Sequence, residues 1–248
     1  MDYRQREIDY GSDALVIGPS KVALLKKVYG LLTASIVFSA LGAMVALYAG
    51  TSSSQVLVQG VAVPPLVMLL AKNWWLGLIL MFGSVFGASA VRQKPGINMV
   101  ALFGMATVLG AVIAPAIFVA QLNALAGTSL TASPVRDAFI LAVAGFSGLS
   151  CYALVAKKDF SAWGGMLMMG LWVVVGASVL SIFVGGWHFH MAIASASVLL
   201  FGGFVLYRTS LLLRMGERDP VGITIGLYMS LLNMFMALLS ILGGGRRR

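Results

Sequence analysis

Charged side chains are scarce in this sequence. Only 10% of the 248 residues are Asp, Glu, Lys or Arg, whereas 60% are hydrophobic and the mean hydropathy is +0.96. A soluble domain carries roughly 25% charged residues, because its surface must be hydrated. So little charge excludes a soluble protein and indicates an outer surface that faces lipid.

The sequence also lacks the alternation of apolar and polar residues that marks the strands of a membrane β-barrel. Its apolar runs are long and continuous. In lipid every backbone N–H and C=O group has to be hydrogen-bonded within the protein, which leaves closed barrels and helices as spanning structures. The sequence therefore predicts an all-α membrane protein that meets the lipid bilayer.

Carboxylates are absent from the middle of the apolar runs. All eight lie in the N-terminal segment, at a helix start or in turns, whereas carboxylates inside spans are the usual marks of cation and proton pathways. Cysteine is nearly absent too: Cys151 stands alone inside an apolar run, so an intramolecular disulfide is excluded and we expect a buried packing thiol.

The net charge is +9, which in a soluble protein would suggest nucleic acid binding. Here the basic residues stand between apolar runs, in the positive-inside pattern of membrane proteins. Nucleic acid is therefore not an expected partner.

Seven apolar runs are long enough to span a bilayer, which takes about 20 residues of helix. The predicted spans are about 28–50, 74–91, 97–122, 137–156, 163–184, 188–213 and 221–242. They form one transmembrane domain over 21–243, between a disordered cytoplasmic tail (1–20) and a basic tail (244–248). Residues 51–73 contain the helix-breaking pair Pro64-Pro65, which predicts an outer loop with a re-entrant or interfacial piece; a span at 55–71 is the alternative.

Lysine and arginine gather at alternate ends of these spans. The N-terminal flank and the turns at 92–96, 157–159 and 214–220 carry them, and the other loops hold little beyond Lys72 and Arg136. The positive-inside rule then places the N-terminus in the cytoplasm. Seven spans put the C-terminus outside, whereas the arginines Arg246–Arg248 favour the cytoplasmic side. The N-terminal flank and the three basic turns all agree with seven spans, so we retain that number.

Arg208 is the charge that lies well inside an apolar run. It precedes Arg214 by about six residues, or roughly 9 Å of helix. The side chain can snorkel to the interface, or it can face polar groups of the seventh span, where Ser230 and Asn233 share one helix face. The sequence alone leaves both interpretations open.

Small residues recur at four-residue spacing in Gly83–Gly87 and Gly222–Gly226, a pattern that lets helices approach closely. We expect these glycines to pack helices within the bundle.

Two further patterns suggest catalysis or metal binding, but neither is expected to form such a site. Gly145-Phe146-Ser147-Gly148 matches the motif of intramembrane rhomboid proteases, with His190 as the potential base. Ser147 lies roughly 15 Å deep, but His190 lies within about one turn of the outer surface, so the two cannot meet and no catalytic residue is assigned. His188 and His190 are expected to be interfacial rather than metal ligands, and no cofactor is expected.

Several motifs together resemble the Bax inhibitor (TMBIM) family, and most closely its bacterial YccA-like branch. They are Lys26–Leu32, Lys94–Ile97, Lys157–Phe160 with Gly164–Met168, and Leu227–Phe235 with Leu238–Gly243. The resemblance covers nearly everything after Lys21, and residues 51–73 look like an insertion.

This resemblance implies a seven-transmembrane-helix bundle with a central seventh helix. For the YccA-like branch it implies a non-catalytic, multi-pass protein of the bacterial inner (plasma) membrane that is both substrate and modulator of the membrane AAA protease FtsH, alongside the HflK–HflC complex. For the wider family it implies a pH-sensitive calcium leak that depends on paired aspartates in the sixth and seventh spans.

The sequence departs from the channel-type members at both aspartates. Arg208-Thr209 stands where they have Asp-Thr, and Ser230 stands where they have the second Asp. Two carboxylates can share a proton and switch near physiological pH, but an arginine and a serine cannot. Calcium leak is therefore the alternative function, and Arg208, Thr209, Tyr228, Ser230 and Asn233 are the candidate cavity or latch residues.

Overall fold

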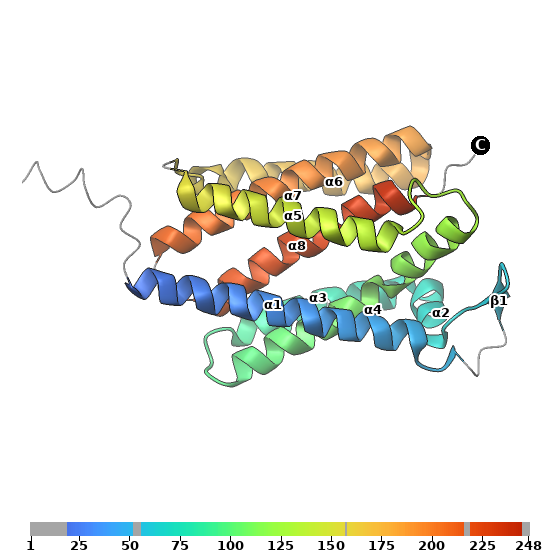
Figure 1. Cartoon of the computed structure of the whole chain (residues 1–248), viewed down its shortest axis with the longest axis horizontal. Coiled ribbons are helices and arrows are strands. Elements are labelled where there is room, and N and C mark those ends of the chain that lie inside the picture. Colours follow the sequence, from blue (N-terminus) through green and yellow to red (C-terminus); the bar gives the residue numbers. More distant parts are fainter. Residues whose placement is uncertain (1–18, 52–55, 157, 216–218, 245–248) are drawn as a thin grey trace, which may run out of the picture.

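The chain folds into a bundle of long helices with one small hairpin at one end (Figure 1). The computed structural model describes residues 19–51, 56–156, 158–215 and 219–244. The helices are α1 (Pro19–Tyr48), α2 (Pro65–Lys72), α3 (Trp74–Val91), α4 (Ile97–Leu125), α5 (Pro134–Val155), α6 (Gly164–Val184), α7 (Trp187–Met215) and α8 (Pro220–Gly243), with a 3-10 turn η3 (Ser161–Trp163) and the strands β1 (Leu57–Val58) and β2 (Val61–Ala62).

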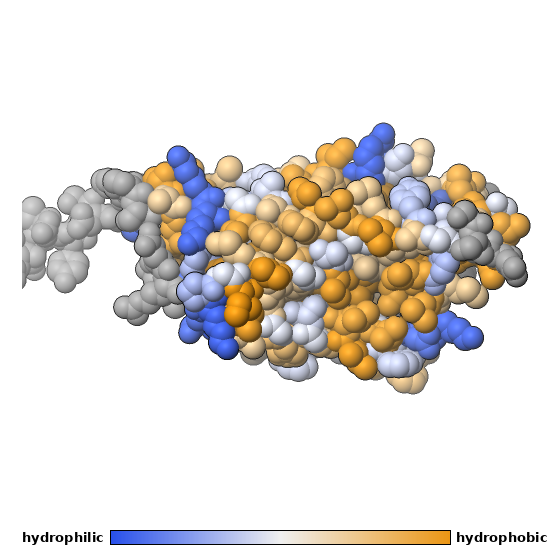
Figure 2. Space-filling view, turned by 90° about the horizontal axis from the view of Figure 1, so that it is seen from below, coloured by the Kyte–Doolittle hydropathy of each residue, from blue (hydrophilic) through white to orange (hydrophobic). Residues whose placement is uncertain are grey.

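Seven helices of the described chain are long and apolar enough to cross a bilayer: α1, α3, α4, α5, α6 with η3, α7 and α8. Figure 2 shows the corresponding surface, with hydrophobic residues across the middle of the face and strongly hydrophilic ones towards its two ends. The predicted seven-span, all-α membrane fold is confirmed.

The last span, α8, is the centre of the bundle. In its most apolar stretch 56% of the residues are buried, against 6% in both α3 and α6. It packs against α1, α4, α5 and α7, and Tyr228 and Leu227 on it are almost fully buried. The central seventh helix that the resemblance implied is confirmed, and α3 and α6 are left facing lipid.

Residues 51–73 do not span. Beyond the four residues outside the described part, they form an antiparallel hairpin pairing Leu57 with Ala62 and then α2, whose 8 residues reach only about 12 Å. Pro64 immediately precedes α2 and Pro65 opens it, where a missing N–H costs nothing. Val67 packs with residues of α1 and α4, so the segment caps one end of the bundle.

The described helices differ from the predicted spans at their ends. The first helix begins at Pro19, so Lys21 lies in its first turn and not before it, because a helix continues past the hydrocarbon boundary into the interface. The predicted tails lie almost wholly outside the described residues, at 1–18 and 245–248.

Helices α1 and α4 approach each other closely. A Cβ built on Gly42 would meet the backbone carbonyl of Thr107, and one built on Gly110 would meet the carbonyl of Ser39. Each helix thus presents a glycine to the backbone of the other, which lets the two helices pack with little space between them.

Two sequence-based expectations about packing are wrong. A Cβ on Gly83 or Gly87 would meet nothing within 4 Å, so this pair faces outward and packs no helix within the chain. Cys151 is exposed and not buried. Both errors have one cause: in an all-apolar span, hydropathy does not tell the lipid-facing side from the buried side.

The ends of the helices sort into two groups. At one end Arg92, after α3, forms an ion pair with Asp219 before α8, with Nε and Oδ2 3.1 Å apart. At the other end Asn123 of α4 donates a hydrogen bond to the carbonyl of Gly243 at 2.8 Å. The first helix starts at one end and α8 finishes at the other (Figure 1), as seven crossings require.

Reporter fusions test how this bundle sits in the membrane. Fusions after Gly96, Asp159 and Gly216 are expected to report the cytoplasm, and fusions after Thr131 and Gly186 the outside, because lysine and arginine favour the cytoplasmic side. A fusion after Arg248 is expected outside, since the C-terminal end of α8 lies beside the end of α4, which leads into a loop predicted to be outside. A cytoplasmic signal there would contradict the seven crossings.

Candidate functional site

An elongated cavity lies between α6, α7 and α8, with Met81 of α3 at its edge. Its volume is about 540 Å³, within the usual range of ligand pockets. Most of the wall is apolar, from Met168 and Leu171 on α6 to Phe204 on α7, and the polar groups lie mainly along α7 and α8, with Ser178 on α6. The cavity begins at Arg208 and reaches His190 on the same helix, a distance of roughly 27 Å along α7.

Arg208 projects across the helix pair into this cavity. Its guanidinium lies so close to α8 at Gly226 that a Cβ at that position would overlap it. Snorkelling would carry the group towards Pro220, at the end of α8, but the structure shows it beside Gly226, six residues further in. Its Nε is buried and has no hydrogen-bond partner among the described residues.

Ser230 and Asn233 line the same cavity as Arg208, so the structure brings together three of the five candidate residues. Both polar side chains bond to their own helix. Ser230 Oγ donates to the carbonyl of Gly226 at 2.9 Å, and Asn233 Nδ2 donates to the carbonyl of Met229 at 2.8 Å. Among the described residues the guanidinium therefore has no counter-charge.

Thr209 and Tyr228 lie elsewhere. Both are almost fully buried, and neither lines the cavity. The hydroxyl of Tyr228 donates to Ser39 Oγ of α1 at 3.0 Å, close to the carbonyl that faces Gly110. Tyr228 is therefore part of the packing between α1, α4 and α8, on another side of α8 from Arg208.

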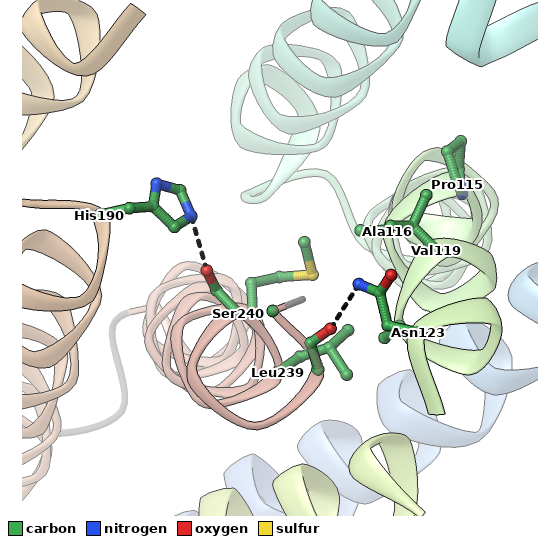
Figure 3. Close-up of a pocket in the computed structure, with 11 residues that line it drawn as sticks. Pro115, Ala116, Val119, Asn123, His190, Leu239 and Ser240 are labelled. Atoms are coloured by element: carbon green, nitrogen blue, oxygen red, sulfur yellow. Dashed lines mark hydrogen bonds between the residues drawn. The ribbon is translucent and has the colours of Figure 1, made fainter. Parts of the chain in front are cut away.

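A second polar pair joins α7 and α8 at the end of the bundle away from Arg92 and Asp219. His190 Nε2 and Ser240 Oγ are hydrogen-bonded at 2.9 Å, and Figure 3 shows the imidazole reaching from α7 to the serine on α8. Ser240 was not among the site residues predicted from the sequence. The signal available in the sequence was position: His190 lies in the first turn of α7 and Ser240 in the last turn of α8, and these two turns lie at the same end of the bundle.

The same end holds a second cavity, of about 430 Å³, between α4 and α8. Pro115 and Asn123 of α4 form one wall, and His190 and Ser240 border it as well as the larger cavity. In Figure 3 Asn123 approaches α8 from the side opposite His190. The His190–Ser240 pair thus stands between the two cavities.

The rhomboid-like motif does not form a catalytic pair. Ser147 is exposed on α5, and the serine bonded to His190 is Ser240 instead. Among the described residues no group of three or more His, Cys, Asp or Glu side chains is placed to hold a metal ion.

The chemistry of the larger cavity suits an anion. Its described lining contains Arg208 and no carboxylate, so the formal charge of the wall is positive. A calcium site needs six to eight oxygen ligands, usually with several carboxylates, and this lining cannot supply them.

Comparisons with known proteins extend over the whole bundle. Residues 21–247 match the family described as Inhibitor of apoptosis-promoting Bax1, the Bax inhibitor family. An uncharacterized membrane protein of Vibrio cholerae is 33% identical over 89% of this chain and 88% of its own length. The Modulator of FtsH protease YccA of Escherichia coli K12 is 32% identical over 90% of this chain and 91% of its own. Protein lifeguard 4 of Mus musculus is 31% identical over 90% of this chain and 85% of its own.

Proposed function

This chain belongs to the Bax inhibitor family, and from that membership we propose that it is a non-catalytic membrane protein that binds and modulates the AAA protease FtsH. The observation that carries the proposal is the 32% identity, over 90% of the chain, to the protein named as a modulator of FtsH. A match that includes α7 and α8 covers the helices that form the core and the larger cavity.

The proposal places the chain in the bacterial inner membrane with its N-terminus in the cytoplasm, where the basic turns would lie. A relative at the same identity is named as an inner membrane protein. FtsH is then the main partner, and the HflK–HflC complex is a second partner by the resemblance to the YccA-like branch.

The cavity supports a binding role over ion conduction. A guanidinium stays protonated at physiological pH, and Arg208 lies in the wall of the larger cavity with no carboxylate among the described lining residues. A fixed positive charge repels the calcium ions that the alternative function would have to pass.

Deleting residues 3–13 is expected to prolong the lifetime of the protein in cells that contain FtsH. An AAA protease has to engage a flexible segment, and residues 1–20 are polar with only a short apolar patch at Ala14–Ile17, a composition typical of disorder. The half-life is measured by pulse-chase labelling, with thermal unfolding of the purified protein as the check on folding.

The control is the same pair of proteins in cells that lack FtsH, where both are expected to be equally long-lived. If the deletion leaves the half-life unchanged in cells that contain the protease, the tail is not where the protease engages this chain.

A further inference from the structure

Arg208 is a partly buried cation with no counter-charge among the described residues. Its Nε is buried without a hydrogen-bond partner, and the nearest polar side chains bond to their own helix. A charge removed from water is costly unless it is paired and hydrogen-bonded. An anionic oxygen group in the cavity would supply the missing partner.

The guanidinium fits one kind of anion particularly well. Its planar fork of N–H donors matches the two oxygens of a carboxylate, and such pairs form two parallel charge-assisted hydrogen bonds. The described cavity lining contains no Asp or Glu side chain that would compete with a ligand for Arg208.

The remainder of the cavity fits an acyl chain. From Arg208 the walls continue along Phe204, Ile193 and Val174 towards His190, roughly 27 Å along α7. One end is therefore cationic and the long middle is mostly apolar, with a few uncharged polar side chains, which is the charge distribution complementary to an amphiphilic anion.

We propose that the cavity between α6, α7 and α8 binds a single-chain fatty acid, with its carboxylate on Arg208 and its chain along the groove towards His190. A volume of about 540 Å³ is that of a pocket for one small ligand, which favours one acyl chain over a two-chain phospholipid. Gly226 has a defined role in this site, because any side chain there would displace the guanidinium.

A photoactivatable palmitate tests the site. The purified full chain is placed in nanodiscs of zwitterionic phospholipid, labelled with a palmitate that carries a diazirine on its chain, and digested to map the labelled residues. Label is expected on groove residues such as Met168, Leu171 and Met229. The methyl ester of the same probe lacks the carboxylate. It is expected to label these residues at least about tenfold less, because a charge-assisted hydrogen-bond pair is lost.

Arg208→Gln is expected to lower groove labelling by the acid to the level of the ester. The matched control is Arg136→Gln. Arg136 is an exposed cation at the start of α5, and α5 does not line the cavity. Should Arg208→Gln fail to fold, Ala237→Phe serves instead, since it fills the groove and leaves the guanidinium in place.

Equal labelling by acid and ester, or label spread over the outward faces of α3 and α6, would overturn the proposal. So would competition by phosphatidylglycerol in the nanodisc as strong as that by unlabelled palmitate, because the occupant would then be a two-chain phospholipid.

Discussion

Replacing Gly110 by alanine is expected to destabilise the bundle by about 1–3 kcal/mol, the usual cost of forcing an extra group into a packed core. The added Cβ would fall on the backbone carbonyl of Ser39, and a backbone cannot rotate away as a flexible side chain can. Separating α1 from α4 would also pull Ser39 Oγ from the hydroxyl of Tyr228, now 3.0 Å away. Thermal unfolding of the purified protein in detergent measures the effect.

The matched control is Gly104→Ala on the same helix. A Cβ at Gly104 meets nothing within 4 Å, and alanine is the better helix former by roughly 0.5–1 kcal/mol. The control is therefore expected to be neutral or slightly stabilising. Equal unfolding temperatures for the two variants would show that α1 and α4 do not pack as closely as the structure has them.

Calcium is not expected to cross this protein. At about 4 Å and an effective dielectric near 20, a unit positive charge repels a divalent cation by about 8 kcal/mol, twice the figure for two unit charges. Arg208 lines the cavity and keeps its charge at any pH between about 6 and 8. Liposomes that contain the purified protein and a calcium-sensitive dye are expected to give the same flux as empty vesicles over that range.

The double variant Arg208→Asp with Ser230→Asp is expected to gain a pH-dependent leak, because both positions line one cavity and two carboxylates there can share a proton. Either change alone is expected to stay silent. The single variants are the controls for damage to the bundle. Calcium flux through the unmodified protein would contradict the account and favour the transport function.

The fold was largely predictable because the bilayer imposes it. Each span needs a long apolar run, so the seven helices follow from hydropathy, and the pair Pro64-Pro65 marks where α2 begins. Helix ends were less predictable: α1 begins at Pro19, because hydropathy locates the hydrocarbon and not the end of the helix.

Contacts between spans were much harder to predict. Gly83–Gly87 and the pair Gly42 and Gly110 are all small residues in apolar runs, yet only the second pair faces a partner backbone. In a bilayer both the lipid-facing side and the buried side of a helix are apolar. The amphipathic pattern that orients a helix in a soluble protein is therefore weak.

The same limit applies to the site. Arg208 could be singled out because a charge in a span is conspicuous, and Ser230 and Asn233 follow from helical spacing. Ser240 was not singled out, because its partner His190 lies on another helix and the signal for the pair is their shared end of the bundle, not the residues around Ser240. Tyr228 was singled out through the family motif, and the structure places it in the packing against α1 and not in the cavity.

The most direct test of the proposed function is crosslinked affinity purification of the tagged full chain from native bacterial membranes. The account predicts that FtsH is recovered with it, with or without HflK–HflC, and that a tagged multi-pass membrane protein of another family does not recover it. Absence of FtsH from the crosslinked material, in membranes where FtsH itself is detected, would contradict the account.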